Sequence, residues 1–437
     1  MRIASRVFVA AVLISTFAFA QSPAPKPAEE VWAIRAANLI DGRADQPLHD
    51  RAIIIRGNRI AEVIDASSLA SRNLARVVNF GPNVTVMPGM IESHTHIFLQ
   101  GEDPAKGGYD ANILKYPLAY RAARATVAAR RLLEQGFTTA RDVETEGAGY
   151  GDVGIKEAIN DGWIPGPRLF VVTRALSTTG GYPLEGYAPE IDLPKGAQLA
   201  DGPVEFRKAT REQLGNGADW IKVYMTHRSW VTADGKLGVQ PTLTLEEIKA
   251  ITDEAHSQGH KVACHAYGGL GLHRALDWGC DSIEHGLDLD DAAIAQMVKQ
   301  GTWYVPTFTA YYYNNAPENT PEGKRDRLRI ELHGPSFQRA LKAGVKIAFG
   351  TDIGGFDWAI NPAVQFPTMV KLGMTPAQAI QSATIDAATL LGMEAQVGSI
   401  EPGKMADIVA VQGDPLNDVG LLQKVGFVMK NGEVFKH

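Results

Sequence analysis

From about residue 88 to residue 391, short apolar segments that resemble β-strands alternate with segments that resemble helices, and the pair repeats eight times. Eight such repeats are typical of a (β/α)8 barrel, or TIM barrel, in which parallel strands form an inner wall and helices an outer ring. Seven of the predicted helices are followed by a glycine that suits a helix C-terminus. The sequence therefore predicts an α/β fold with a barrel over 89–391. The predicted strands are 90–96, 137–143, 168–175, 220–225, 261–266, 282–285, 303–308 and 346–351, and the predicted helices are 116–135, 152–161, 203–216, 244–258, 270–278, 290–300, 327–343 and 375–391.

The segments on either side of the barrel, 31–88 and 392–437, contain short alternating strands instead. Gly57-Asn58 and Asn431-Gly432 are dipeptides that favour tight turns between antiparallel strands. Neither segment alone is long enough to bury a core. We therefore expect both ends of the chain to pair into one small β-sandwich domain.

The first twenty residues are predicted to be a signal peptide. Arg2 and Arg6 give a basic start, an apolar run follows, and Ala18-Phe19-Ala20 matches the pattern that a signal peptidase cleaves. We expect cleavage before Gln21, a flexible leader over 21–30, and a protein exported to a periplasm or secreted. The alternative is an uncleaved anchor. No later segment is long and apolar enough to span a membrane, so no membrane partner is expected after cleavage.

The charge of the chain argues against a nucleic-acid-binding protein, and its cysteine content allows at most one disulfide. The net charge is -6 at pH 7 and the basic residues are scattered, so no nucleic-acid partner is expected. The two cysteines, Cys264 and Cys280, lie in apolar strand-like segments. Exported chains often form disulfides, but buried free thiols are the expectation here.

Six residues lie at or near the C-terminal ends of predicted strands, where barrel enzymes place their active sites. Two of them, His94 and His96, are two positions apart, which on a strand directs both rings to one face and lets them chelate one ion. Together the set suits a pair of divalent cations in a hydrolase. The six are His94, His96, Lys222, His265, His285 and Asp352.

Lys222 is the most informative of the six. Alternation in its strand directs Trp220, Lys222 and Tyr224 to one face, inside the predicted barrel. A buried lysine tends to lose its proton, and the neutral amine can react with carbon dioxide to form a carbamate that bridges two cations. The alternative is an ion pair with Asp142 or Asp352.

The mechanistic hypothesis follows from these ligands. Two divalent ions, with Zn²⁺ as the first choice, lower the pKa of a bridging water and supply the hydroxide that attacks an amide carbonyl. Asp352 takes the proton and delivers it to the departing amine. Manganese and cobalt accept the same ligands.

With those residues in place, the chain resembles the metal-dependent amidohydrolase superfamily. Within it, the chain is similar to the imidazolonepropionase-related branch, which includes Xaa-Pro and Xaa-Arg dipeptidases and hydrolases of ochratoxin. The motifs that carry the resemblance are Pro88-Gly89-Met90-Ile91-Glu92-Ser93-His94-Thr95-His96, Thr138-Thr139-Ala140-Arg141-Asp142, Gly166-Pro167-Arg168, Cys264-His265-Ala266, Glu284-His285-Gly286, Gly350-Thr351-Asp352 and residues 398–409.

The resemblance implies specific roles. His94, His96 and Asp352 would hold one ion, His265 and His285 the other, and carboxylated Lys222 would bridge them. It also implies a homo-oligomer, in some relatives an octamer. One position departs from the branch, which often has Thr-Gly-Gly-His where this chain has Thr179-Gly180-Gly181-Tyr182. Because that histidine often faces the substrate, the departure concerns the substrate and not the metal chemistry.

The predicted substrate is a dipeptide or N-acyl amino acid, with an aromatic or prolyl C-terminal residue as the first guess. Its free carboxylate needs a partner, and the candidates are Tyr224, His227 and Arg228, with Tyr182 beside them. Arg228 is alternatively a solvated loop cation. An ochratoxin-like N-acyl-phenylalanine fits the same site. The alternatives are a cyclic amide or lactone substrate, or a binding protein without catalysis.

Overall fold

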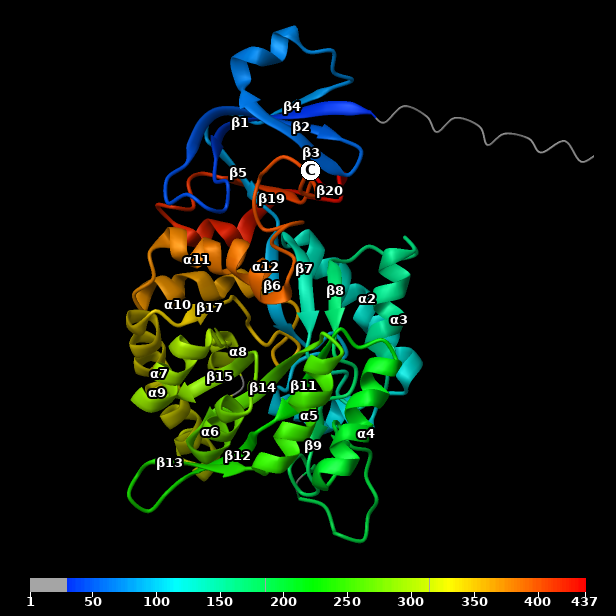
Figure 1. Cartoon of the computed structure of the whole chain (residues 1–437), viewed down its shortest axis with the longest axis vertical. Helices are drawn as coiled ribbons and strands as arrows, with labels where there is room; N and C mark the ends of the chain where they lie inside the picture. Colours follow the sequence, from blue (N-terminus) through cyan, green and yellow to red (C-terminus); the bar gives the residue numbers. More distant parts are fainter. Residues whose placement is uncertain (1–29, 185, 314) are drawn as a thin grey trace, which may run out of the picture.

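The structure is a computed structural model that describes residues 30–184, 186–313 and 315–437. The predicted signal peptide (1–20) lies outside the described residues, as does the predicted leader up to residue 29. Two bodies are visible in Figure 1: a β-domain, and a larger barrel beside it.

Within the described residues, eight parallel strands form the barrel wall in two hydrogen-bonded groups. The first group is β6 (Met90–Thr95), β7 (Phe137–Asp142) and β8 (Arg168–Val171); the second is β11 (Trp220–Tyr224), β14 (Lys261–Gly268), β15 (Ser282–Asp288), β16 (Trp303–Val305) and β17 (Lys346–Ile347). Backbone hydrogen bonds close both seams. The Asp219 amide donates to the Val171 carbonyl at 2.7 Å, and the Asp352 amide donates to the His94 carbonyl at 2.9 Å. The predicted (β/α)8 barrel is confirmed.

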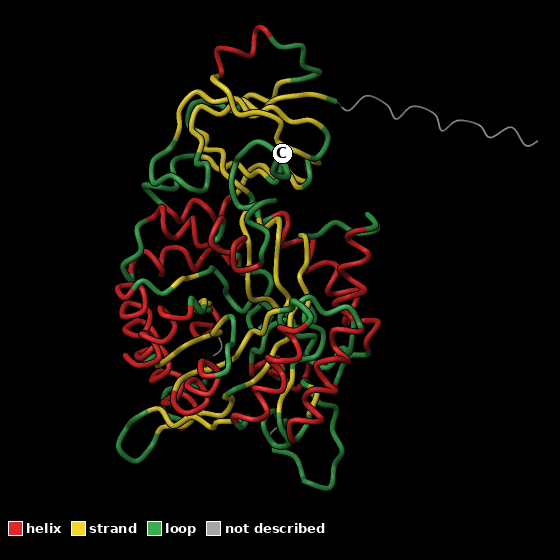
Figure 2. The backbone as a smooth tube through the Cα atoms, viewed as in Figure 1, coloured by secondary structure: helices red, strands yellow, loops and turns green. Residues whose placement is uncertain are grey.

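Helices surround the wall (Figure 2). All seven glycines predicted to follow helices have positive φ, between 73° and 101°. These glycines are Gly136, Gly162, Gly217, Gly259, Gly279, Gly301 and Gly344. The helices are α1 (Gly108–Leu114), α2 (Leu118–Glu134), α3 (Gly151–Asn160), α4 (Gly202–Gly215), α5 (Leu245–Ser257), α6 (Gly269–Asp277), α7 (Asp291–Gln300), α8 (Phe308–Tyr313), α9 (Pro321–Ala343), α10 (Gln365–Lys371), α11 (Pro376–Ser382) and α12 (Ile385–Leu391).

The N-terminal end of the barrel is filled by apolar side chains. Ile91, Trp220, Trp303 and Val305 from the strands pack with Leu390 of α12 in one buried cluster. Burying large apolar side chains stabilises the fold by roughly 1.5–3 kcal/mol each. Because this end is closed, the barrel opens only at the C-terminal ends of its strands. The arrows of β7 and β8 in Figure 1 show that this open end points away from the β-domain.

Strands from both chain ends form one sheet in the β-domain. Its strands are β1 (Val31–Leu39), β2 (Leu48–Arg56), β3 (Arg59–Asp65), β4 (Val77–Asn79), β5 (Val84–Pro88), β18 (Ile408–Gln412), β19 (Val425–Lys430) and β20 (Glu433–Lys436). β18 pairs antiparallel with both β5 and β19, so the C-terminal strands extend the N-terminal ones. The sheet is continuous and curls around a core that includes Trp32, Ile53 and Phe427, in place of two separate sheets.

Three expectations from the sequence need correction. Cys264 and Cys280 are not free thiols, because they form a disulfide between β14 and the turn before β15. The predicted helix 375–391 is two helices, α11 and α12, separated at Thr384, whose φ of -130° and ψ of -98° are not helical. Helix α9 begins six residues earlier than predicted, after Thr320, whose side chain accepts a hydrogen bond from the Gly323 amide.

The strands β9 (Leu176–Ser177), β10 (Gln198–Leu199), β12 (Thr226–Val231) and β13 (Leu237–Pro241) were not predicted. β12 and β13 form a hairpin beyond β11, and this hairpin carries His227 and Arg228.

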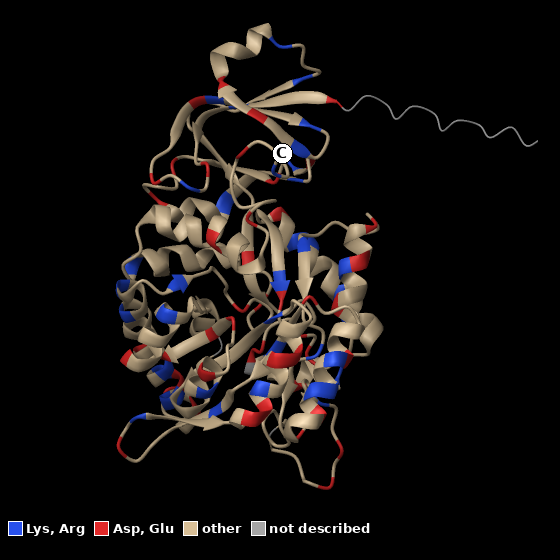
Figure 3. Ribbon diagram, viewed as in Figure 1, with Lys and Arg blue, Asp and Glu red and all other residues tan. Residues whose placement is uncertain are grey.

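The charged residues of both signs are interspersed over both bodies (Figure 3). Among the described residues, none of the helices has the length and apolar character needed to cross a bilayer.

Candidate active site

A cavity of about 710 Å³ opens at the C-terminal ends of the barrel strands. All ten residues that the sequence singled out line it. They are His94, His96, Tyr182, Lys222, Tyr224, His227, Arg228, His265, His285 and Asp352. The structure therefore brings together residues that are widely separated in the chain.

Each of the six candidate ligands comes from the end of a barrel strand. His94 lies on β6 and His96 follows it, while Lys222, His265 and His285 lie on β11, β14 and β15. Two of the six have unusual backbones: φ is 75° at His285 and 66° at Asp352. A left-handed conformation is costly for a non-glycine residue and is found where function requires it. Here it turns these two side chains toward the cavity.

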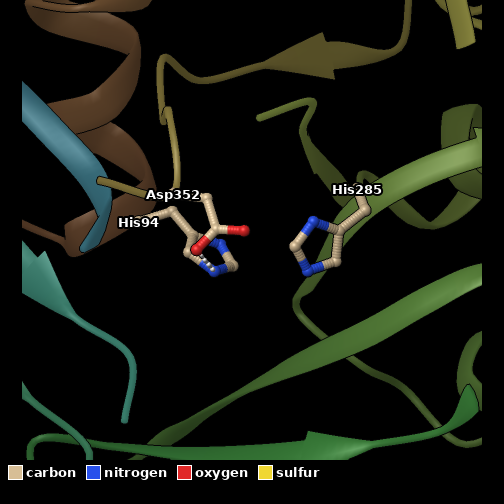
Figure 4. A group of neighbouring side chains, drawn as sticks. All are labelled: His94, His285 and Asp352. Atoms are coloured by element: carbon tan, nitrogen blue, oxygen red, sulfur yellow. Dashed lines mark ion pairs between the residues drawn. The ribbon is translucent and has the colours of Figure 1, made fainter. Parts of the chain in front are cut away.

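Three of the side chains converge most closely. The ligand atoms of His94, His285 and Asp352 all lie within 4.8 Å of one another. Figure 4 shows the three side chains facing a common space from three different segments. The other two imidazoles, of His96 and His265, each lie next to a member of this group. The ring centroids of His96 and His94 are 5.3 Å apart, and those of His265 and His285 are 4.3 Å apart. The group forms a possible metal site.

Buried acceptors outside the cavity fix the orientation of two rings. His94 Nδ1 lies 2.8 Å from Glu284 Oε2, and Arg141 donates to the other oxygen of Glu284 at 2.8 Å. His285 Nδ1 lies 2.8 Å from Thr307 Oγ1. A hydrogen bond at Nδ1 leaves Nε2 for a cation, as is common for metal-bound histidines.

Glu92 joins the segments that carry His94 and Asp352. Its Oε1 accepts hydrogen bonds from the His94 amide at 3.0 Å and the Thr351 amide at 2.9 Å, and its Oε2 accepts one from Thr351 Oγ1. Burial raises the pKa of Glu92 to about 8, although these hydrogen bonds oppose the shift. Glu92 therefore ties β6 to the segment after β17.

Three of the imidazoles are held neutral. Burial lowers the pKa values of His94, His265 and His285 well below the usual range, and the positive charge of Lys222 adds to the effect for all three. Metal ions bind the neutral form of histidine. The electrostatics of the cavity thus keep these rings ready to act as ligands.

Lys222 is buried, with 1% of its surface exposed. Burial lowers its pKa, although Glu284, Glu144 and Asp352 oppose the shift. Among the described residues, no carboxylate forms an ion pair with it, so the alternative pairing with Asp142 or Asp352 is wrong. A buried amine with a lowered pKa and no counter-ion has the properties that carbamate formation requires.

Asp352 contacts two imidazoles through one oxygen. Its Oδ1 lies 3.1 Å from His96 Nε2 and 3.8 Å from His94 Nε2. Burial would raise the pKa of Asp352, but its interactions with His94 and His96, which include a hydrogen bond from His96, outweigh burial and lower that pKa. Burial likewise opposes the charged form of His96, yet the hydrogen bond to Asp352 outweighs it and raises the pKa of His96 to about 9.

The donor set fits divalent cations. His94 Nε2 and His265 Nε2 are buried and have no hydrogen-bond partner among the described residues. A buried polar atom without a partner is costly, and such atoms are rare in folded proteins. Two imidazole nitrogens left in this state, one of them 3.8 Å from the Asp352 carboxylate, are accounted for when a cation binds them.

Two of the residues predicted to contact the substrate form hydrogen bonds within the protein. Tyr182 donates to Glu146 Oε2 at 3.0 Å, and Tyr224 donates to Glu144. Both hydroxyls are therefore already committed to carboxylates. His227 is half-buried and burial lowers its pKa to about 4, while Arg228 is exposed on the hairpin.

Six further charged residues that line the cavity were not predicted: Glu102, Asp110, Glu146, Arg325, Asp326 and Arg329. Glu102 and Glu146 follow β6 and β7, and Arg329 lies on α9. Glu102 and Glu146 follow predicted strand ends, so their position was a usable signal. Arg329 gave none, because it lies inside a long helix whose exposed face carries many charges.

The comparisons with known proteins agree with this geometry. The model of the amidohydrolase family matches residues 85–435. The chain belongs to the amidohydrolase family. It is 31% identical to the ochratoxinase of Aspergillus niger, over 93% of this chain and 87% of the relative. It is 25% identical to the imidazolonepropionase of Pseudomonas putida, over 86% and 90%.

Solved structures give the same result. The fold matches a crystal structure of a Xaa-Pro dipeptidase with bound methionine in the active site, with a TM-score of 0.84 and 34% identity over 93% of this chain and 100% of that chain. As a member of the amidohydrolase family, the protein is a hydrolase that acts on amide bonds.

Proposed function

We propose that the protein is a binuclear-metal hydrolase that cleaves the amide bond next to a C-terminal amino acid, in a dipeptide or an N-acyl amino acid. The observation that carries the proposal is the convergence of four imidazoles, one carboxylate and an unpaired buried lysine on one cavity. The relatives named ochratoxinase and Xaa-Pro dipeptidase support an amide of this kind.

The residues divide between two cations. His94, His96 and Asp352 would hold one cation, His265 and His285 would hold the other, and Lys222 as a carbamate would be a ligand of both. Zn²⁺ is the first choice because it accepts imidazole nitrogen and carboxylate oxygen. The cations, when bound, supply an activated water and polarise the scissile carbonyl.

The protein's own residues move the proton. Both imidazole contacts of Asp352 are made by Oδ1, which leaves Oδ2 for proton transfer. Since the pKa of Asp352 is lowered, it is ionised near neutral pH and accepts the proton of the attacking water. The same oxygen then delivers the proton to the departing amine.

Cationic side chains favour a substrate with a free carboxylate. Arg228 and Arg329 both line the cavity, and a guanidinium binds a carboxylate through two parallel hydrogen bonds. A cyclic amide or a lactone without a carboxylate leaves these groups unused. We therefore place the C-terminal amino acid of the substrate beside Arg228 and Arg329. An aromatic or prolyl residue is the first choice for that amino acid.

Metal analysis combined with a turnover assay tests the proposal. We expect about two equivalents of metal per chain. We also expect hydrolysis of N-acyl amino acids or dipeptides in preference to a dihydropyrimidine or a lactone. Asp352→Asn should lower kcat by about 10²–10⁴-fold, the range for a lost general base. Full activity in that variant, or protein that binds no divalent cation, would contradict the proposal.

We further propose that the protein is exported and cleaved before Gln21, and that it forms a homo-oligomer. The Cys264–Cys280 disulfide supports an oxidising compartment. Mass spectrometry of the purified N-terminus and light scattering of the intact protein test the two points.

A further inference from the structure

The cavity carries opposite charges on its two halves. Glu102 and Glu146 follow β6 and β7, the first and second barrel strands. Arg228 lies on β12, which follows the fourth strand, and Arg329 lies on α9, which follows the seventh. Because α9 packs against β15, the sixth strand, and against β12, these arginines belong to the half of the barrel across from β6 and β7.

Glu146 is a rigid acceptor on the acidic half. It is 2% exposed, and its Oε2 accepts hydrogen bonds from Tyr109 at 2.5 Å and from Tyr182 at 3.0 Å. Its Oε1 lies 3.5 Å from His96 Nδ1. The carboxylate is therefore held beside the candidate metal ligands. Tyr182, the position that departs from the branch, is one of the two side chains that hold it.

Glu102 lies on the same half and is less constrained. Its backbone amide donates to the Gly355 carbonyl at 2.9 Å, which places it beside the segment of Asp352. In the part of the chain that the structure describes, its half-buried carboxylate has no hydrogen-bond or ion-pair partner. Burial, followed by the charges of Asp352 and Glu146, raises the pKa of Glu102 to about 8. A carboxyl group with this pKa is mostly protonated at pH 7 in the free protein, and an ammonium group of the ligand beside it favours the ionised form.

The basic half is equally fixed. Arg329 Nε donates to Ser229 Oγ at 3.0 Å, its Nη1 lies 3.5 Å from Asp326 Oδ1, and its guanidinium lies 5.0 Å from the centroid of the Tyr267 ring. Arg228, Arg325 and Arg329 outnumber Asp326 on this half, so the two halves carry opposite net charges on either side of the histidine cluster.

Resting on the proposed function, we propose that Glu102 and Glu146 bind a positively charged group on the acyl side of the scissile amide, the free α-amino group of a dipeptide. A dipeptide carries an ammonium and a carboxylate at its two ends, and two extended residues span about 7 Å. It matches both halves of the cavity at once. An N-acyl amino acid matches only the basic half, so the protein prefers unblocked dipeptides.

A matched pair of substrates isolates the ammonium. Propionyl-phenylalanine is alanyl-phenylalanine without its amino group, so the two differ at one position. With the metal-loaded wild-type protein at pH 7, we expect kcat/KM for alanyl-phenylalanine to exceed that for propionyl-phenylalanine by about tenfold to hundredfold, as for a hydrogen bond between charged groups.

Variants of Glu102 assign the preference to this carboxylate. Glu102→Gln should lower the ratio of the two kcat/KM values by about tenfold, mainly through KM of the dipeptide, and Glu102→Lys should bring the ratio below one. Glu62→Gln on β3 changes the net charge by the same one unit far from the cavity and should leave the ratio at the wild-type value.

The outcomes separate this inference from the proposed function. If propionyl-phenylalanine is cleaved as well as the dipeptide, or if Glu102→Gln keeps the wild-type ratio, the role of the acidic half is wrong while amide hydrolysis stands. If metal-loaded protein cleaves neither compound, nor the corresponding prolyl pair, both proposals fail.

Discussion

Glu284 is a fully buried carboxylate that connects His94 with Arg141 and does not line the cavity. Its loss should therefore act through the orientation of His94. We expect Glu284→Gln to weaken cation binding by about 10- to 100-fold, the usual effect of losing a carboxylate behind a metal-bound histidine. Competition with a chelator, followed by metal analysis, measures the affinity.

Ser282→Ala provides the matched control for this prediction. Ser282 Oγ donates to Glu284 Oε1 at 2.5 Å but does not contact His94. Its removal should change cation affinity much less. Equal losses in the two variants would show that packing around Glu284, and not its bond to His94, decides the affinity.

Two arginines on the basic half are predicted to bind the substrate carboxylate. Arg228→Met and Arg329→Met should each raise KM by about tenfold for substrates with a free C-terminus, because a charge-assisted hydrogen bond is lost. C-terminally amidated analogues are the comparison. A similar rise in KM for the amidated analogues would assign the arginines to the shape of the cavity instead.

The six candidate ligands were predictable because each stands at the end of a predicted strand, where a barrel collects side chains. The partners that position them were not assigned from the sequence. Glu92 is two residues before His94 and Glu284 is next to His285, but only the fold shows which backbone amides and rings these carboxylates contact. Cys264 and Cys280 carried no signal that distinguishes a pair from two free thiols.

At the scale of elements, helices α4 and α5 are joined by the carboxylate of Glu254. It accepts hydrogen bonds from Arg211 at 2.8 Å and from Arg207 at 3.0 Å. The hydrogen bond from Arg211 is the main cause that lowers the pKa of Glu254 to about 2, while burial opposes it. The ion pair therefore stabilises the folded state above the unfolded-state pKa of about 4.3, and this contribution is lost as the pH falls toward 2.

Measurements of the free energy of unfolding against pH test this prediction. The difference in free energy of unfolding between the wild type and Glu254→Gln should be largest at pH 5–7 and should shrink between about pH 4.3 and pH 2. Glu246→Gln, an exposed position on the same helix, is the control and should show little such dependence. A difference that stays constant over this range would contradict the coupling.

The elements were predictable to different degrees. Helices with an apolar face and a glycine after them, such as α3 and α7, lie within one residue of the predicted ranges. Strands β16 and β17 are shorter than predicted, although the residues after β17 still form backbone hydrogen bonds with both neighbours: the Ala348 amide donates to the Tyr304 carbonyl, and the Ser93 amide donates to the Phe349 carbonyl. The hairpin β12–β13 was missed since its polar, exposed residues lack the alternation that marks a half-buried strand.

At the scale of the whole molecule, the cations should stabilise the barrel. Their ligands come from β6, β11, β14, β15 and the segment after β17, so ions that bind only the folded state link distant strands. At a free cation concentration a thousand times Kd, this linkage contributes about 4 kcal/mol. Removal by a chelator should abolish activity and lower Tm by several degrees in calorimetry, and added Zn²⁺ should restore both. An unchanged Tm would contradict metal binding at this site.

The continuous sheet of the β-domain has a consequence for how the chain is made. Val86 of β5 has Ala410 of β18 as its neighbour, and the barrel is synthesised between them. While the chain emerges from the ribosome, one long side of β5 stays unpaired until almost the last residues have been added. Such late, non-local pairing is slow, and exposed strand edges recruit other chains. The β-domain therefore stays incomplete until β18 has been synthesised, and until then the free edge of β5 is open to association with other chains.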